Sequence, residues 1–357
     1  MYVAGIDAHT TYLVVVVVSN TGERVLGPTR VPYGKREQLM ELLAAYRPLE
    51  VVVETSPGWA WLRDTLVAQG IGFVLAHAKR LRAIAEANYK RDAIDAELLA
   101  RMRVAGCIPA VHAKPPAQRE LALLVRHRAW LVRQRTCLAN RVHAQLHTVG
   151  LRLARGRLLT KSGQQWVRQQ AWPQLGPEQR RLIRTHLRLI AQTRHLIRGL
   201  DQQVEKVAAT LPACALLRTI PGIGAYRALA LASEVLPVER FAAAKYLVSY
   251  AGLAPRSSAS GLRPIRYGAL PAGANRWLRG TLVRTVVTHL QYAPDSPLSA
   301  YYAGVKQRLG WRVARIATAR KLTRIVHHML KTGESWSTSA GGASLAPPAP
   351  PRAEAAD

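Results

Sequence analysis

Two aspartates in the first third of the chain, Asp92 and Asp95, are three residues apart in a run that contains neither glycine nor proline. Ala, Leu and Glu dominate this run, which predicts a helix. The spacing places both carboxylates on one side of that helix. Ile94, Leu98 and Met102 are expected to form an apolar stripe on another face. A pair of this kind usually lies on a solvated helix face, so an interpretation as a metal site depends on acids elsewhere in the chain.

Two further acids follow expected strands. Asp7 comes directly after residues 3–6. Glu54 comes directly after the valines at 51–53. A carboxylate at the end of a buried strand costs desolvation free energy unless a cation meets it, and strand ends are where open α/β sheets bind ligands. With the helical pair, these acids would form a cluster of four carboxylates, whose oxygens suit Mg²⁺ or Mn²⁺ better than zinc. Two such ions about 4 Å apart are a recurrent device for phosphodiester chemistry.

The elements that must position these acids alternate between strand and helix. Residues 12–19 form an unbroken, mostly β-branched run of the kind that is buried on both faces of a sheet. Further strands are expected at 3–6, 24–31, 51–53 and 72–75, with helices at 35–46 and 58–69. Strands alternating with helices predict an α/β domain in this part of the chain.

The charge of the protein is strongly positive and unevenly distributed. Lys and Arg number 51 against 21 Asp and Glu, a net charge of +30 over 357 residues. Residues 1–112 contribute only +2 and the remainder +28. A nearly neutral domain joined to a very basic remainder favours a polyanionic partner, most simply nucleic acid.

Beyond residue 114 the sequence is almost entirely helical in character. Two long helices are expected at 118–149 and 177–211, joined by a looser stretch at 150–176. The second helix carries a heptad of mostly β-branched residues, namely Ile183, Ile190, Ile197 and Val204. Such a heptad favours a two-stranded coiled coil and therefore a homo-oligomer, a dimer or a tetramer. The alternative is an intramolecular hairpin in which the two helices pack on each other.

A Pro-Gly-x-Gly turn made by Pro221, Gly222 and Gly224 precedes an expected helix at 226–235. The free backbone amides of such a turn, at a helix N-terminus, can hold a phosphate. This pattern predicts a helix-hairpin-helix that binds the nucleic-acid backbone without regard to sequence, and a plain helical hairpin is the alternative.

A polar, basic and irregular stretch follows at residues 254–263. Its serines, Ser257, Ser258 and Ser260, have no histidine nearby in the sequence, so no hydrolase triad is indicated. Four arginines in and after this stretch are candidate nucleic-acid contacts: Arg256, Arg263, Arg276 and Arg279. A further basic helix is expected at 308–331, and the Ala- and Pro-rich tail from 338 is expected to be disordered.

Several classes of protein are disfavoured. Cys107, Cys137 and Cys214 form no C-x-x-C pair, which argues against a disulfide framework and a thiolate zinc site. The first residues lack the pattern of a signal peptide, and the valine run at 14–18 is too short to span a bilayer. A cytoplasmic protein without a membrane partner is expected.

Three segments resemble the DEDD domain of the one-hundred-and-ten family of insertion-sequence transposases. They are Gly5-Ile6-Asp7, the valine run that ends in Glu54-Thr55-Ser56, and Lys90-Arg91-Asp92-Ala93-Ile94-Asp95-Ala96. Ile220-Pro221-Gly222-Ile223-Gly224, Leu253-Ala254-Pro255-Arg256 and Ser260-Gly261 resemble the second, C-terminal domain of that family. The resemblance covers roughly residues 1–330, in the order and spacing of the family.

The resemblance implies an RNase H-like, RuvC-like domain at 1–112 in which Asp7, Glu54, Asp92 and Asp95 hold Mg²⁺. It further implies a coiled-coil insertion at 113–211 used for oligomerisation and a C-terminal transposase domain at 212–337, before the tail at 338–357. The serine that attacks DNA corresponds to Ser260, and Ser257 and Ser258 are nearby alternatives. Members of the family are guided by a structured bridge RNA that pairs with donor and target DNA. Because the resemblance implies that the protein acts on DNA, a bacterial, nucleoid-associated location is expected.

The chain also departs from the pattern of the family. Arg91 stands where a threonine is usual, and we expect its side chain to point away from the acids. Pro271-Ala272-Gly273 stands where Lys-Arg-Gly is common, which removes two cations near the expected nucleophile.

Three other functions are alternatives to a recombinase. A RuvC-like nuclease would hydrolyse branched DNA with metal-activated water and would not need the serine loop. An actin-like or sugar-kinase ATPase also begins with Gly-Ile-Asp, but it needs a Gly-rich turn where this chain has Ala8-His9-Thr10. A non-catalytic nucleic-acid-binding remnant is disfavoured because all four acids and the serine are present.

Overall fold

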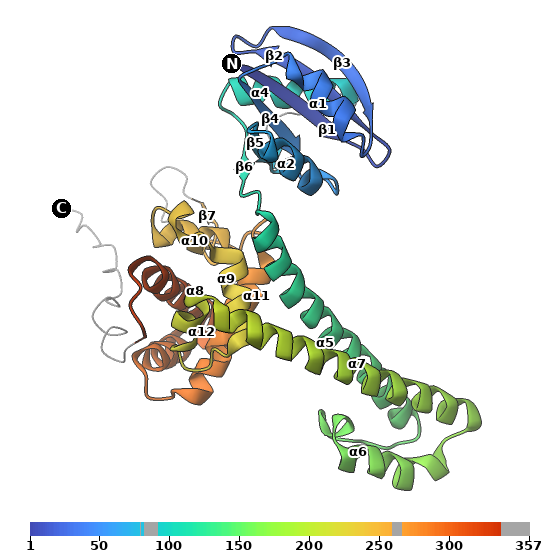
Figure 1. Cartoon of the computed structure of the whole chain (residues 1–357). Coiled ribbons are helices and arrows are strands. Elements are labelled where there is room, and N and C mark those ends of the chain that lie inside the picture. The colour runs from blue at the N-terminus through green and yellow to red at the C-terminus, as the bar shows by residue number, and fades with distance from the viewer. Residues whose placement is uncertain (79, 82–91, 259–265, 337–357) are drawn as a thin grey trace, which may run out of the picture. The chain divides into compact units, whose positions relative to one another are not determined.

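The structure is a computed structural model that describes residues 1–78, 80–81, 92–258 and 266–336. The chain divides into two compact units, Met1–Ala117 and Gln118–Asp357 (Figure 1). In the described part of the chain, no helix is long and apolar enough to cross a bilayer.

The first unit is built around a mixed sheet of six strands in the order β3-β2-β1-β4-β5-β6. Strands β1, β4 and β5 run parallel, whereas β2, β3 and β6 each pair antiparallel with their neighbours. The strands are β1 (Tyr2–Ala8), β2 (Tyr12–Ser19), β3 (Arg24–Pro32), β4 (Leu49–Glu54), β5 (Gly72–Ala76) and β6 (Ala110–Val111). This architecture confirms the predicted α/β domain. Strand β6 was not predicted, because two residues are too few to show a period.

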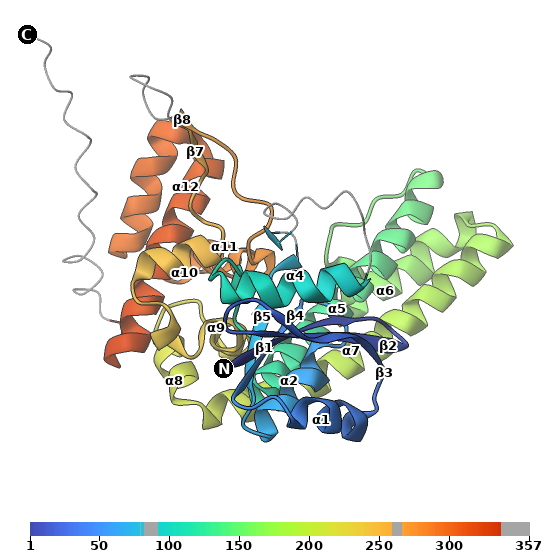
Figure 2. The same cartoon turned by 90° about the horizontal axis from the view of Figure 1, so that it is seen from above.

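Helices cover both faces of this sheet. Alternate residues of β1 and β2, such as Ile6 and Val15, pack with α1 (Arg36–Ala44) and α2 (Trp59–Ala68). The intervening residues face α4 (Asp92–Val104), as the packing of Val3 and Val52 against Leu99 shows. Figure 2 shows α4 on one side of the sheet and α1 and α2 on the other. The valines of β2 are almost completely buried, as expected for a strand covered on both faces.

Helix α4 lies unusually close to β1. A Cβ atom added at Gly5 would be 2.9 Å from the backbone N of Ala100 and would collide with the carbonyl oxygen of Ala96. The helix therefore buries a face of small residues, and its packing depends on a glycine in the strand. The predicted stripe was partly wrong: Met102 is buried, but Ile94 is 41% exposed.

The second unit begins with two long helices that pair with each other. These are α5 (Pro116–Thr148) and α7 (Pro177–Thr210), which are antiparallel: Arg128 meets Asp201 at one end, and Gln145 meets Gln179 at the other. The heptad residues of α7 are buried within the chain, namely Ile183, Ile190, Ile197 and Val204. The structure thus has the intramolecular hairpin, and it leaves the predicted coiled-coil oligomer untested.

The stretch between these helices is more structured than predicted. It contains α6 (Lys161–Trp166) and flanking short helical turns. Leu158, Val167 and Leu175 are buried in one cluster with residues of both long helices. This segment therefore closes the far end of the hairpin with a small core of its own, which its irregular apolar spacing did not reveal.

The rest of the second unit is a helical bundle. Its helices are α8 (Pro212–Arg218), α9 (Ala225–Val235), α10 (Ala244–Tyr250), α11 (Arg276–Tyr292) and α12 (Pro297–Thr332), with a two-stranded ribbon of β7 (Ser257–Ser258) and β8 (Arg266–Tyr267). A single core joins α8 to α12 with the adjoining ends of α5 and α7. Helix α12 begins well before the predicted start, because Ser296 caps it by accepting a hydrogen bond from the Ser299 amide. The helix is broken at Gly310, where φ is +77°.

Candidate functional site

Asp7 and Glu54 lie at the same end of neighbouring parallel strands. Strand β1 pairs with β4 so that Ile6 is opposite Val53, and each acid is the next residue of its strand. Side chains alternate along a strand. Because Ile6 and Val53 pack with α1 and α2, the two acids belong to the opposite face of the sheet, the face covered by α4.

Helix α4 brings the other two acids to this face. It begins at Asp92, and Ala96, one turn later, lies over Gly5. Its first turn therefore lies near the end of β1 where Asp7 is found. Asp95 lies in the same first turn. Carboxylates in the first turn of a helix interact favourably with the exposed backbone N–H groups there.

The tightest grouping contains Asp7, Asp92 and one residue that the sequence did not predict, His9. One ligand atom from each of the three lies within 4.8 Å of the other two. His9 Nε2 is 3.0 Å from Asp7 Oδ2 and 3.3 Å from Asp92 Oδ1, so the imidazole bridges the two carboxyl groups. Glu54 and Asp95 are outside this grouping.

Tyr12 is a second unpredicted neighbour. Its hydroxyl donates a 2.8 Å hydrogen bond to Asp92 Oδ2, and its ring lies 4.8 Å from the His9 ring, centroid to centroid. His9 lies in the turn that follows β1, and Tyr12 is the first residue of β2. Their proximity in sequence to Asp7 was the available signal, but its meaning depends on where α4 begins.

The two central carboxyl groups have different electrostatic surroundings. Burial raises the pKa of Asp7; the His9 contact opposes this shift, and the charges of Asp95 and Asp92 add to it. The hydrogen bond from Tyr12 lowers the pKa of Asp92. Asp92 is therefore held as a carboxylate, whereas Asp7 gains most from a cation beside it.

The donor set fits a hard divalent cation. Two carboxylates converge on one point, a third (Asp95) is close enough to shift the pKa of Asp7, and Glu54 ends the adjacent strand on the same face. Carboxylate oxygens are the ligands that Mg²⁺ and Mn²⁺ prefer. The raised pKa of a partly buried acid is also the observation expected where a cation is part of the working site.

The predicted nucleophile region is only partly described. Ser260 and Arg263 lie outside the described residues, as does Arg91, so its predicted orientation is not tested. Ser257 and Ser258 form β7 and pair with β8. Arg256, directly before β7, is exposed, and its backbone is hydrogen-bonded to Gly268 and Ala269, which directly follow β8.

The Pro-Gly-x-Gly turn connects α8 to α9, as predicted. Gly222 has a φ of +88°, and a Cβ there would be 2.9 Å from the His289 backbone N, so the turn packs tightly on α11. The carbonyl of Pro221 accepts a hydrogen bond from the imidazole of His289. Gly224 is the exposed N-cap of α9. The turn thus has one side held by α11 and the other accessible.

The two predicted arginines of α11 differ in their contacts. Arg276 is exposed at the first turn of the helix. Arg279 donates hydrogen bonds to the carbonyl oxygens of Gly252 and Pro271, at 3.2 and 3.4 Å. Arg279 therefore also holds together the loop that precedes the helix.

Comparisons with known proteins decide the family. Residues 4–150 match the model of the DEDD-type IS110 transposases, described as "Transposase", and residues 214–303 match "Transposase IS116/IS110/IS902 family". The chain belongs to the IS110 family of transposases. The acids of the first unit fall within the first match, and the Pro-Gly-x-Gly turn and α11 fall within the second.

Relatives of this IS110-family transposase extend over most of its length. The transposase for insertion sequence element IS1111A of Coxiella burnetii is 25% identical over 309 residues, 86% of this chain and 84% of the relative. The transposase for IS1328 of Yersinia enterocolitica is 27% identical over 85% of this chain and 90% of its own. Among solved structures, T. thermophilus RuvC in complex with a Holliday junction substrate matches at 16% identity, covering 31% of this chain and 99% of its own, with a TM-score of 0.26.

Proposed function

We propose that this transposase cleaves and rejoins DNA strands with an acidic site on the first unit and a serine on the second. The acidic site is RuvC-like and consists of Asp7, Glu54, Asp92 and Asp95. The observation that carries the proposal is the convergence of Asp7 and Asp92, which come from a strand end and from the first turn of a helix far along the chain. Two carboxyl groups this close repel each other when both are ionised, and a bound cation would offset that repulsion.

The four acids would hold Mg²⁺ or Mn²⁺, which supplies positive charge to the scissile phosphate and its leaving oxygen. The residues of the chain itself prepare this site. The Tyr12 hydroxyl holds Asp92 in one orientation at 2.8 Å. The burial of Asp7 strengthens its attraction for a cation. His9 links the two carboxyl groups and keeps them close together.

Ser260 is proposed as the nucleophile. Its hydroxyl oxygen forms a bond to phosphorus, the phosphodiester bond to one strand end breaks, and that end leaves as a hydroxyl that takes up a proton. The energy of the broken bond is retained in the serine–DNA ester. A hydroxyl of another strand can then displace the serine, so strands are exchanged without an external energy source.

The partners follow from charge and family. A net charge of +30 suits the binding of donor and target DNA together with a structured bridge RNA. The helical hairpin of α5 and α7 is proposed as the oligomerisation element, because its outer faces carry exposed apolar residues such as Leu196 and Trp130. We further propose that the turn at Pro221, Gly222 and Gly224 binds backbone phosphate through the exposed start of α9.

A denaturing gel tests the reaction. Wild-type protein incubated with DNA, RNA and Mg²⁺ should give a covalent protein–DNA adduct, and Ser260→Ala should abolish it. Ser257→Ala and Ser258→Ala serve as matched controls that should retain the adduct. Cleavage without an adduct, leaving free phosphate ends and unaffected by Ser260→Ala, would replace this proposal with hydrolysis by a RuvC-like nuclease.

A further inference from the structure

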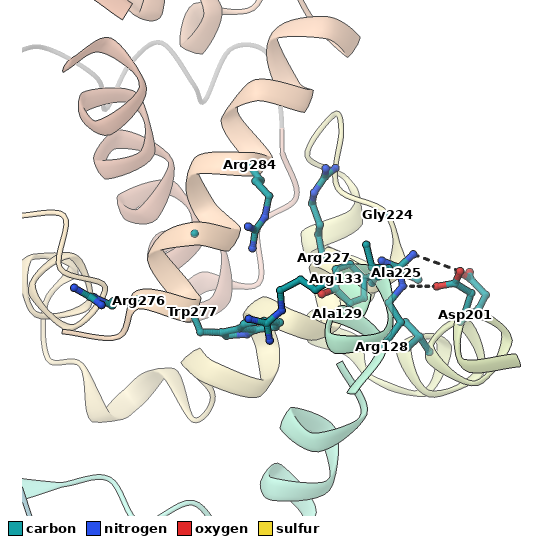
Figure 3. Close-up of a pocket in the computed structure, with 15 residues that line it drawn as sticks. Arg128, Ala129, Arg133, Asp201, Gly224, Ala225, Arg227, Arg276, Trp277 and Arg284 are labelled. Carbon is teal, nitrogen blue, oxygen red and sulfur yellow. Dashed lines mark hydrogen bonds and ion pairs between the residues drawn. The ribbon is translucent and has the colours of Figure 1, made fainter. Parts of the chain in front are cut away.

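A cavity of about 870 Å³ opens in the second unit between α5, α7, α9 and α11. Five arginines line it, from three of these helices: Arg128, Arg133, Arg227, Arg276 and Arg284. Figure 3 shows these side chains, with Arg227 and Arg284 beside each other and Arg276 pointing away from the other arginines. The volume is typical of a ligand pocket.

The cations of this cavity exceed its acids. Only Asp201 and Glu205 line it with negative charge. Asp201 is paired with Arg128 at 2.8 Å, and Glu205 is paired with Arg218, outside the lining, at 2.8 Å. Among the described residues, no ion pair joins the other four lining arginines to a carboxylate.

Two of these arginines face each other without an acid between them. Arg227 is half-buried and donates a 2.7 Å hydrogen bond to the carbonyl of Gly222, which fixes its guanidinium beside the Pro-Gly-x-Gly turn. Burial and the neighbouring charge of Arg284 both lower the pKa of Arg227. Like charges brought together at a partly desolvated site cost free energy that an anion would offset.

The lining also contains a helix N-terminus and aromatic rings, which can contact a nucleic acid. Gly224 and Ala225, at the N-terminus of α9, belong to the lining, and Gly224 is exposed. Trp277 has a buried indole Nε1 with no hydrogen-bond partner among the described residues. The Tyr226 ring lies 4.5 Å from the guanidinium of Arg128. Cations interleaved with aromatic rings are the pattern of nucleic-acid-binding grooves.

We propose that this cavity binds consecutive phosphates of a nucleic-acid strand. Arg133 and Arg284 would contact them from the exposed rim, and Arg227 from the floor beside the turn. This proposal rests on the proposed function and deepens it, because it adds Arg133, Arg227 and Arg284, which no motif in the sequence indicated, to the strand-binding surface. The arginines would contact phosphates rather than bases, so binding would be independent of base sequence.

Fluorescence anisotropy of the full chain in EDTA tests the cavity without any chemistry. The probes are labelled single-stranded DNA, duplex DNA and RNA of one sequence, each titrated at several salt concentrations. The test variant is Arg133→Gln/Arg284→Gln, because both side chains are exposed and folding should not depend on them. The matched control is Arg320→Gln/Arg324→Gln, which removes the same charge from an exposed face of α12.

The test variant should bind at least one probe about tenfold to a hundredfold more weakly than wild type. The slope of log K against log salt should become less steep by about 1.4 to 1.8. The control should lose much less affinity, and the probe that loses most identifies the strand as DNA or RNA. Equal losses in both variants, or no loss in either, would overturn the cavity proposal. Because the assay contains no metal, a missing serine adduct would contradict the proposed function without affecting this result.

Discussion

The acidic site of the first unit and the arginine cavity of the second are constructed in opposite ways. At the acidic site, the carboxyl groups already have partners: His9 for Asp7, and Tyr12 for Asp92. In the cavity, Arg133 and Arg284 have no ion pair with any described carboxylate. The acids come from strand ends and a helix start, whereas the arginines extend on long side chains from helix surfaces.

The difference indicates two kinds of task. Groups positioned by a sheet and by short side chains can be held to the accuracy that bond cleavage needs. Long arginines on helices can adjust to a backbone whose phosphates move. The acidic site is therefore suited to chemistry, and the cavity to retention of a strand.

The largest effect is expected at the acidic site. Asp7→Asn should reduce DNA cleavage by about 10³-fold or more, because it removes charge at the point where the scissile phosphate is stabilised. Glu41→Gln, which changes an exposed acid on α1, is the matched control and should cleave as wild type. A gel-based cleavage assay with Mg²⁺ measures both, and near-normal cleavage by Asp7→Asn would exclude this aspartate from the site.

Glu234, an acid of the second unit, is expected to have a purely structural role. Glu234 is 1% exposed and bonds Arg126 at 2.6 Å and Asn275 at 2.8 Å. Glu234→Ala would remove both hydrogen bonds to a buried carboxylate and should lower the free energy of unfolding by about 1–3 kcal/mol. Urea unfolding measures this, with the exposed Glu239→Ala expected within about 0.5 kcal/mol of wild type. A small effect of Glu234→Ala would contradict a structural role.

A third prediction concerns the approach of α4 to the sheet. Gly5→Ala adds a Cβ that collides with the α4 backbone. It should cost about 1–3 kcal/mol of stability and displace Asp92 from Asp7, which weakens Mn²⁺ binding as well. Gly27→Ala, in β3, is the control, since nothing lies within 4 Å of its added Cβ. Thermal unfolding and Mn²⁺ titration of both variants should separate them; identical behaviour would show that α4 does not depend on Gly5.

The smallest effect is expected from a buried histidine behind the cavity. Burial lowers the pKa of His289, which is bonded to Pro221 and lies 2.7 Å from Ser296 Oγ. A lowered pKa in the folded state means that the stabilising contribution is present above the unfolded value of about 6.5 and is lost as the pH falls through it. Unfolding free energy should therefore decrease by up to about 1.4 kcal/mol per pH unit below that value. His289→Asn, measured by urea unfolding at the same pH values, should flatten this dependence, and an unchanged slope would assign it to other groups.

Much of the fold could be predicted because it depends on local pattern. The valine runs correctly predicted β2 and β4, and the helical spacing of apolar residues correctly predicted α5 and α7. The observed ends differ from the predicted ones by a few residues. Two errors have physical causes. Ile94 is exposed because α4 packs through small residues against Gly5, and the stretch before α7 is structured because both long helices cover it.

The sequence indicated the four acids of the candidate site but not the other residues that contact them. Asp7 and Glu54 could be selected because a carboxylate beside a buried strand costs desolvation free energy, and Asp92 and Asp95 because their spacing places both on one side of a helix. His9 and Tyr12 could not, since neither a histidine in the turn after β1 nor a tyrosine at the start of β2 is unusual. Their contacts arise only when the first turn of α4 lies above that turn.

The amino-acid sequence alone was sufficient to separate a nearly neutral α/β region from a basic helical one, and to select two acids at strand ends and two on one side of a helix. Period and charge are local properties of a chain, so they can be read without coordinates. Which segment packs against each helix face, in contrast, depends on residues that are far apart in the chain. Ile190 could have packed against a second copy, and only the tertiary structure shows it buried within its own chain. Likewise, the arginines of α5, α9 and α11 line one cavity only because these helices pack around one core.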